Sequence, residues 1–155
     1  MAYRLFRSLP LACVLVALGS APARNEAAPR IIMLYAGMLG ERQVFMTNWH
    51  ENLRLMASVT GVVHRDAEEL DRMPMIRAAL FWGHQWDAYA SDPAKLDSLS
   101  PDLAGQHALI YPAREGREAL VMFTSAWSGK PGYIRRVDSD GVRLLEGYGI
   151  PTSVD

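Results

Sequence analysis

The first 23 residues of the chain have the pattern of a secretory signal peptide, and they contain its only cysteine, Cys13. The segment has a positively charged start at Arg4 and Arg7, a short apolar core at Leu9–Gly19 and a small-x-small ending at Ala21-Pro22-Ala23. Cleavage after Ala23 leaves a chain that enters an oxidising compartment without a thiol. Disulfides therefore cannot stabilise the mature protein, and its fold has to rest on a hydrophobic core.

Three other interpretations of this segment fail on physical grounds. A membrane-spanning helix needs roughly 20 apolar residues, and the apolar run here is much shorter. Lipidation requires a cysteine directly after the run, whereas Cys13 lies inside it, and no Arg-Arg pair precedes the run as twin-arginine export requires. We expect the general secretory route, a periplasmic or secreted protein, and no stable membrane anchor after cleavage. Residues 24–30 are polar and rich in alanine, so we expect a flexible lead-in.

The mature chain has a size and charge that are ordinary for one soluble domain. Its 132 residues are enough to bury a core without cross-links, which predicts a single globular domain over residues 31–155. Loss of Arg4 and Arg7 leaves 14 basic residues against 17 acidic ones, a net charge of −3 with neutral histidines. Nucleic-acid surfaces need a clustered basic excess, so we expect no nucleic-acid partner.

The hydrophobic pattern predicts an α+β fold. It consists of an N-terminal β-hairpin, central short helices, a C-terminal antiparallel β-meander and a short terminal helix. Strands are expected at residues 31–35, 42–47, 75–82, 107–112, 118–124 and 133–137. Helices are expected at residues 49–60, 67–72, 84–90 and 142–146. The run 75–82 is consistent with a buried strand or a buried helix, and we prefer the strand.

Two local signals support these boundaries. Asn48 is followed three residues later by Glu51, and Asp66 by Glu69, which is the capping-box arrangement at a helix start. Asp138-Ser139-Asp140-Gly141 is interpreted as a turn, because the ligand series of a calcium loop is missing.

Motifs for known chemistry are mostly absent from the sequence. His50-Glu51 begins like a zinc-protease motif, but Arg54 stands where the second histidine is required. No Gly-x-Ser-x-Gly, phosphate loop or dinucleotide fingerprint occurs. Met73-x-Met75 has the local form of a soft copper site, yet most methionines lie in apolar runs, so we interpret them as core. We therefore expect no cofactor and no metal.

The histidines give the candidate catalytic residues. His84 and Asp87 have i, i+3 spacing, so on one helix face the carboxylate would orient the imidazole for general-base or metal chemistry. His50 with Glu51, and His107, are further candidates for such a site if separate segments converge. A surface ion pair at a helix end explains the same spacing equally well.

An aromatic set gives the candidate ligand-binding residues. Trp82, Trp86 and Tyr89 are spaced by four and three residues and would form a shelf beside His84 for stacking a small ligand. The competing interpretation is that these rings pack in the core.

Taken together, these patterns predict a small exported domain that binds a small ligand or an envelope protein partner without catalysis. The alternative is a small hydrolase or metal-dependent enzyme that uses His84 and Asp87 with His50 or His107. An interaction module within an envelope assembly is a third class, for which an exposed apolar patch on the C-terminal sheet would be the sign.

Overall fold

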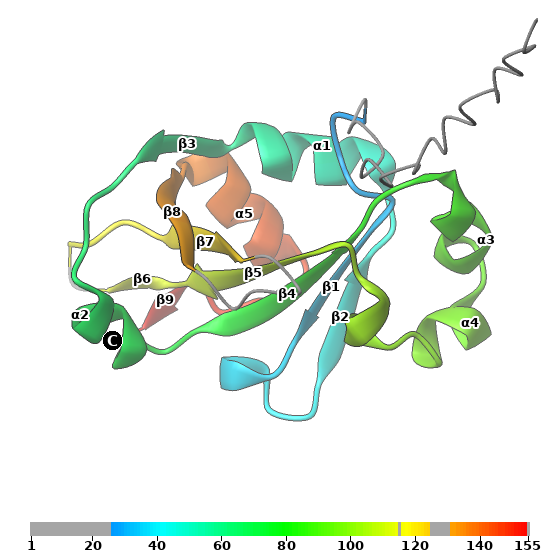
Figure 1. Cartoon of the computed structure of the whole chain (residues 1–155), viewed down its shortest axis with the longest axis horizontal. Coiled ribbons are helices and arrows are strands. Elements are labelled where there is room, and N and C mark those ends of the chain that lie inside the picture. Colours follow the sequence, from blue (N-terminus) through cyan, green and yellow to red (C-terminus); the bar gives the residue numbers. More distant parts are fainter. Residues whose placement is uncertain (1–25, 115, 125–130, 155) are drawn as a thin grey trace, which may run out of the picture.

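The computed structural model describes residues 26–114, 116–124 and 131–154, which form a seven-stranded antiparallel sheet with short helices (Figure 1). The strands lie in the order β2-β1-β4-β5-β7-β8-β3. Their bounds are β1 Ile31–Tyr35, β2 Gln43–Met46, β3 Val59–Val62, β4 Ile76–Phe81, β5 Gln106–Tyr111, β7 Leu120–Thr124 and β8 Pro131–Val137. This is the predicted α+β class, and the segment predicted to be a signal peptide lies outside the described residues.

The predicted N-terminal hairpin is confirmed. Strands β1 and β2 pair in antiparallel register from Ile32 with Met46 to Tyr35 with Gln43, and the 3-10 turn η1 (Gly37–Leu39) connects them. Gly37 has φ +60°, and a Cβ added there would collide with the carbonyl oxygen of Met75. This position therefore requires glycine both for its backbone conformation and for the close approach of β4.

Strand β4 joins the two halves of the sheet that the sequence predicts separately. It pairs with β1 on one side, where Met33 faces Ala79, and with β5 on the other, where Ala79 faces His107. The apolar run over residues 75–82 is thus a strand, buried on both faces except at Arg77. The predicted C-terminal meander is also confirmed, because β5, β7 and β8 are consecutive antiparallel neighbours.

Two nine-residue helices cover one face of the sheet. In α1 (Trp49–Ala57) the side chain of Asn48 accepts a hydrogen bond from the backbone N–H of His50. In α5 (Ser139–Gly147) Asp138 accepts from the backbone N–H groups of Asp140 and Gly141. The segment interpreted from sequence as a turn is therefore the first turn of α5, because the Asp138 carboxylate satisfies its free donors.

The other helices are shorter and lie at the two ends of the sheet. Helix α2 is at one end, while α3 and α4 are at the opposite end (Figure 1). Their bounds, with the associated 3-10 turns, are α2 Ala67–Asp71, η2 His84–Trp86, α3 Asp87–Ala90, α4 Pro93–Asp97 and η3 Pro101–Leu103. The predicted helix over residues 84–90 is thus a 3-10 turn followed by one α-helical turn, and α4 was not predicted.

Three further elements differ from the sequence-based expectation. Residues 59–62 continue from α1 into β3, which pairs with β8 at the sheet edge. Strands β6 (Ala113–Arg114) and β9 (Ser153–Val154) form a small parallel pair. Residues 26–30 pack closely, with Ala28 0% exposed and Pro29 fully buried, so this part of the expected flexible lead-in belongs to the fold. Residues 24 and 25 lie outside the described residues.

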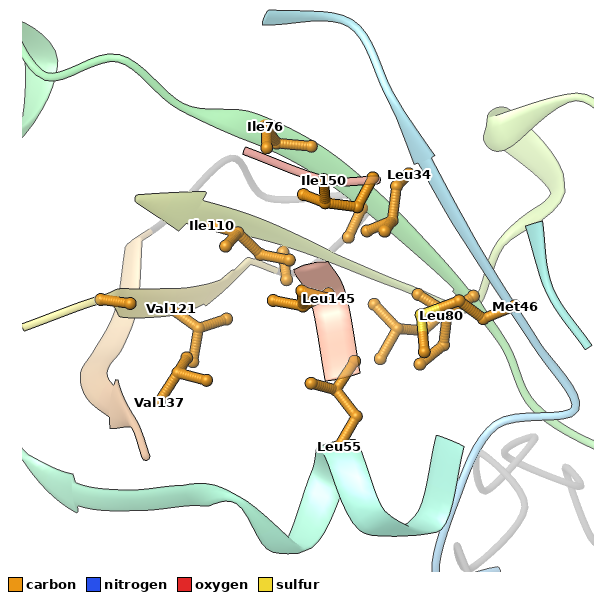
Figure 2. Packing of buried hydrophobic residues seen from close by; sticks show 14 of the residues in the cluster. Leu34, Met46, Leu55, Ile76, Leu80, Ile110, Val121, Val137, Leu145 and Ile150 are labelled. Atoms are coloured by element: carbon orange, nitrogen blue, oxygen red, sulfur yellow. The ribbon is translucent and has the colours of Figure 1, made fainter. Parts of the chain in front are cut away.

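One continuous hydrophobic cluster fills the space between the sheet and the helices α1 and α5. Leu55 of α1 and Leu145 of α5 point toward the sheet, where they meet Ile110, Val121 and Val137 (Figure 2). Ala78 and Ala108 are direct partners on adjacent strands and line the small void beneath these leucines. Small residues at the centre of the sheet let the helices approach it closely.

The opposite face of the sheet carries two separate clusters. At one end, Phe81 and Leu99 pack with the partly buried rings of Trp86 and Tyr89. At the other end, Leu70 of α2 packs on Tyr111, Leu120 and Met122. Met73 and Met75 pack against this second cluster, in keeping with the core interpretation of both methionines.

Within residues 26–114, 116–124 and 131–154, no helix has the length and hydropathy that crossing a membrane requires.

Candidate functional site

The structure brings His84 and Asp87 together at an exposed corner of the molecule. His84 opens η2 and Asp87 opens α3, directly after β4 ends. Asp87 Oδ2 lies 3.0 Å from His84 Nδ1, so the carboxylate can accept a hydrogen bond from a protonated Nδ1. The imidazole is 76% exposed, which places it at the protein surface rather than in a pocket.

Arg30 is the third member of this group and comes from a segment 54 residues away. Its Nη2 lies 2.9 Å from Nδ1 and 3.1 Å from Nε2 of His84. A guanidinium only donates hydrogen bonds, so Arg30 occupies the space next to both ring nitrogens as a donor. Both ring nitrogens of His84 therefore lie within hydrogen-bond distance of a protein group.

Glu26 is the fourth member and ties the N-terminal segment to η2. Its Oε2 accepts a hydrogen bond from the backbone N–H of Gly83 at 3.0 Å. Its Oε1 lies 3.8 Å from Arg30 Nη2 and 3.7 Å from His84 Nε2. Arg30 Nε also lies 3.5 Å from Asp87 Oδ1, so the guanidinium stands between two carboxylates. We call these four residues, Glu26, Arg30, His84 and Asp87, the His84 cluster.

The packing around Arg30 explains why the cluster is fixed in place. The guanidinium lies over the ring of Trp49, 5.9 Å from its centroid, and the side chain is only 20% exposed. The backbone N–H of Arg30 donates to the carbonyl of Phe81 at 2.8 Å. Buried Asn52 of α1 donates to the carbonyls of Pro29 and Arg30. Residues 29 and 30 are therefore held between α1 and the end of β4.

The chemistry available to the His84 cluster is limited by its own contacts. Among the described residues, no serine, threonine or cysteine side chain lies within hydrogen-bond distance of His84. A divalent cation would compete with the Arg30 guanidinium for the position between Glu26 and Asp87. In the part of the chain that the structure describes, no three His, Cys, Asp or Glu side chains are grouped to hold a metal ion.

The predicted aromatic residues are divided between the two faces of the sheet. Trp82 packs against the continuous cluster under α1 and α5. Trp86 packs edge-on against Phe81 at 4.9 Å between ring centroids, and Tyr89 against Trp86 at 5.4 Å, in the cluster on the opposite face. Trp82 therefore does not share a shelf with the other two rings, and all three are partly buried.

The remaining predicted residues lie apart from His84. His50 is exposed at the start of α1, where its ring meets the edge of Trp49 at 5.5 Å. His107 is in the middle of the sheet on β5, paired with Ala79 and Thr124. Glu51 accepts a hydrogen bond from the hydroxyl of Tyr148, on the outer side of the two helices.

A cleft of about 460 Å³ lies between α1 and α5, next to this last contact. We call it the α1–α5 cleft; it is lined by Glu51, Arg54, Asp140, Arg143, Leu144, Gly147 and Tyr148. Partial burial and the neighbouring Glu51 carboxylate raise the pKa of Tyr148 to about 12, so its hydroxyl stays protonated at neutral pH. Arg54 Nη2 donates to both carboxylate oxygens of Asp140, at 3.3 and 3.2 Å.

Sequence reasoning missed Glu26 and Arg30 because both lie in a polar segment that carries no periodic pattern. The available signal was Ala28, a small apolar residue shortly before β1. It also missed Tyr148, whose partner Glu51 is 97 residues away. Comparison of the chain with protein-family models, with curated proteins and with solved structures gives no match.

Proposed function

We propose that the protein is exported by the general secretory route and acts in the periplasm or outside the cell as a non-catalytic domain. Its role is to bind an envelope protein partner, and its contact surface is the exposed corner around the His84 cluster. The observation that carries this proposal is that protein groups, Asp87 and Arg30, lie within hydrogen-bond distance of both His84 ring nitrogens. A general base or a metal ligand needs a free lone pair on one of them.

Exposure favours a protein partner over a small molecule at this corner. Small-molecule sites bury most of their ligand in a concave pocket, whereas the His84 ring is 76% exposed and the Asp87 side chain 51%. The rings of Trp86 and Tyr89 pack against the core, so little of either is available for stacking. An exposed imidazole that is held beside a carboxylate can form directional hydrogen bonds to a facing protein surface. Because the side chain is already ordered in the free protein, binding loses little conformational entropy.

The sheet edges are less suitable for partner binding. At β2, the carbonyl of Met46 is occupied by the side chain of Asn52. At β3, a register shift between Thr60 and Val62 interrupts the edge. Both features hinder the addition of another strand, so they support a side-chain surface rather than strand pairing as the mode of binding.

The test is site-specific photo-crosslinking in protein exported to a bacterial periplasm. A photoreactive residue at exposed Ala88, next to Asp87, should give one adduct of constant mass. The same residue at exposed Asp71 on α2, at the far end of the sheet, should not. The Ala88 adduct should weaken at least severalfold in His84→Ala and Asp87→Asn, and persist in Arg72→Gln, which alters an exposed residue next to α2.

Three results would overturn the proposal. An adduct that does not depend on His84 would remove the assigned surface. Turnover of an envelope substrate that is lost in His84→Ala, or that a chelator abolishes, would favour the hydrolase or metal-enzyme class. A ligand mass that survives native mass spectrometry of the wild type and is missing in His84→Ala would indicate a small-molecule site. The export step is tested separately, by sequencing the mature N-terminus, which we expect to be Arg24.

A further inference from the structure

The α1–α5 cleft is bounded at each end by a contact between the two helices. At one end the Arg54 guanidinium is paired with the Asp140 carboxylate. At the other, the Tyr148 hydroxyl donates to Glu51 Oε2. Asp140 and Tyr148 are eight residues apart, so the cleft runs along about 12 Å of the α5 axis.

The cleft is open beside Tyr148, because α5 ends there in a glycine, Gly147. A Cβ added at Gly147 would meet no atom within 4 Å, so the absence of a side chain leaves free space rather than a packing contact. Partly buried Leu144 and the ring of Tyr148 provide apolar surface beside it. A volume of about 460 Å³ lies within the range of small-molecule sites.

Two groups of opposite charge have unused hydrogen-bonding capacity in this cleft. Glu51 Oε1 has no hydrogen-bond or ion-pair partner among the described residues, because Tyr148 uses only Oε2. Arg143 donates from Nε to the Ser139 carbonyl at 3.1 Å, and within the described ranges its two Nη groups have no partner. Both residues line the cleft, Glu51 from α1 and Arg143 from α5.

We propose that the α1–α5 cleft binds a free amino acid with an apolar side chain in its zwitterionic form. The ammonium group donates to Glu51 Oε1, the carboxylate accepts from the Nη groups of Arg143, and the side chain lies on Leu144 in the space beside Gly147. An α-amino acid carries an ammonium and a carboxylate on the same carbon, so it offers one oppositely charged group to each of these two side chains. The proposal uses no residue of the His84 cluster, so its failure and that of the proposed function are independent.

The test is a two-dimensional NMR titration of the full mature protein with leucine. Leucine should produce saturable shifts at the amides of Leu144, Gly147 and Tyr148. Leucinamide lacks the carboxylate and N-acetylleucine lacks the ammonium, so each should bind about tenfold more weakly or not at all, since each loses one charge-assisted contact. Arg143→Gln and Glu51→Gln should weaken leucine binding by a similar factor, and Gly147→Leu should fill the cleft and abolish it.

Arg72→Gln is the matched control, because Arg72 is an exposed arginine at the end of α2 and remote from the cleft. It should leave the leucine titration unchanged. The proposal is overturned if leucine causes no saturable shift up to its solubility limit, or if leucinamide and N-acetylleucine bind as well as leucine. The leucine titration and its comparison with the two leucine analogues use the wild-type protein, so both tests remain valid even if a variant does not fold.

Discussion

The two faces of the sheet are stabilised in different ways. Among the residues that the structure describes, 15 buried residues on one face form a single cluster beneath two helices of nine residues each. On the other face, the buried residues of the same ranges divide into clusters of six and four, beneath helical segments of five residues or fewer. Helices this short are not stable alone, so each depends on its local cluster.

This difference separates global from local stability. Removing a side chain from the continuous cluster affects contacts that join α1, α5 and most strands of the sheet. Removing one from a separate cluster affects one end of the molecule, which can open while the rest stays folded. The His84 cluster lies at such an end, whereas the α1–α5 cleft is formed by the two helices of the continuous core.

Truncation of Leu145 should have the largest effect on stability. Leu145 is 1% exposed and sits at the centre of the continuous cluster (Figure 2). Leu145→Ala should lower the free energy of unfolding by about 3 to 5 kcal/mol, through lost burial and the cavity left behind. The measurement is denaturant unfolding followed by circular dichroism.

Leu70 on α2 provides the matched change on the other face, because it is 5% exposed in the four-residue cluster. Leu70→Ala should cost about 2 kcal/mol, the low end for such a truncation, since α2 can shift to fill the space. Hydrogen exchange should increase across the whole sheet in Leu145→Ala and mainly around α2 in Leu70→Ala. Equal costs and equal exchange patterns would show that the two faces do not differ in this way.

Asn52 should have the next largest effect, because it links α1 to both the N-terminal segment and β2. It is fully buried and donates to the carbonyls of Pro29, Arg30 and Met46 at 3.1 to 3.3 Å. Asn52→Ala should cost about 2 to 3 kcal/mol, since buried carbonyls lose their donor.

His84→Ala is the comparison for Asn52→Ala, because both residues contact Arg30 of the N-terminal segment and His84 does so at the protein surface. It should cost no more than about 1 kcal/mol, because exposed charge contacts contribute little to stability. Thermal and denaturant unfolding of both variants measure this ranking. A larger cost for His84→Ala would mean that the His84 cluster holds the fold together and is not free to serve a partner.

Two glycines of α5 test whether the inner side of this helix is closely packed and its outer side is open. A Cβ at Gly141 would lie closer than 3.0 Å to Ser58 Oγ and Val137 Cγ1, whereas one at Gly147 would meet nothing within 4 Å. Gly141→Ala should therefore destabilise the protein by about 1 to 3 kcal/mol through overpacking. Gly147→Ala should stabilise it by at most about 1 kcal/mol, because alanine favours the helix. Melting temperatures that move in the same direction would contradict this packing of α5.

The sequence predicts the parts of the fold that have strong local patterns. The apolar runs that became β1, β4, β5 and β7 are long enough to be found by composition alone, and Asn48 marks the start of α1. Strand β3 was missed because Val59–Val62 follows α1 without a turn and contains Gly61, so only its pairing with β8 makes it a strand. Asp138 was interpreted as part of a turn because turns and helix N-caps favour the same residues.

The candidate sites depend much more on tertiary contacts. The contact between His84 and Asp87 follows from their spacing in the sequence. Arg30 is 54 residues from His84, and Glu51 is 97 residues from Tyr148, so no periodic pattern connects either pair. The division of Trp82 from Trp86 arises because Trp82 directly follows β4 and packs on one face, after which η2 turns the chain toward the other.

The contact between Tyr148 and Glu51 should have the smallest effect on stability, and one that appears only in alkali. Burial, the hydrogen bond to Glu51 and its negative charge raise the pKa of Tyr148 to about 12, against 10.0 for an ordinary tyrosine. The unfolded chain therefore loses this proton first. The stabilising contribution of neutral Tyr148 is complete below about pH 10 and is lost as the pH rises toward 12.

Glu51→Gln keeps the shape of the side chain and removes its charge, so it should move the Tyr148 pKa part of the way back toward 10, because the effect of burial remains. The measurement is an NMR titration of the tyrosine ring carbons, with Tyr148→Phe to assign the signal and Glu41→Gln, at an exposed position, as the charge control. A Tyr148 signal that titrates like an exposed tyrosine in the wild type would contradict the closed contact between α1 and α5. It would also remove one end of the proposed cleft, since Glu51 is oriented there by the Tyr148 hydroxyl.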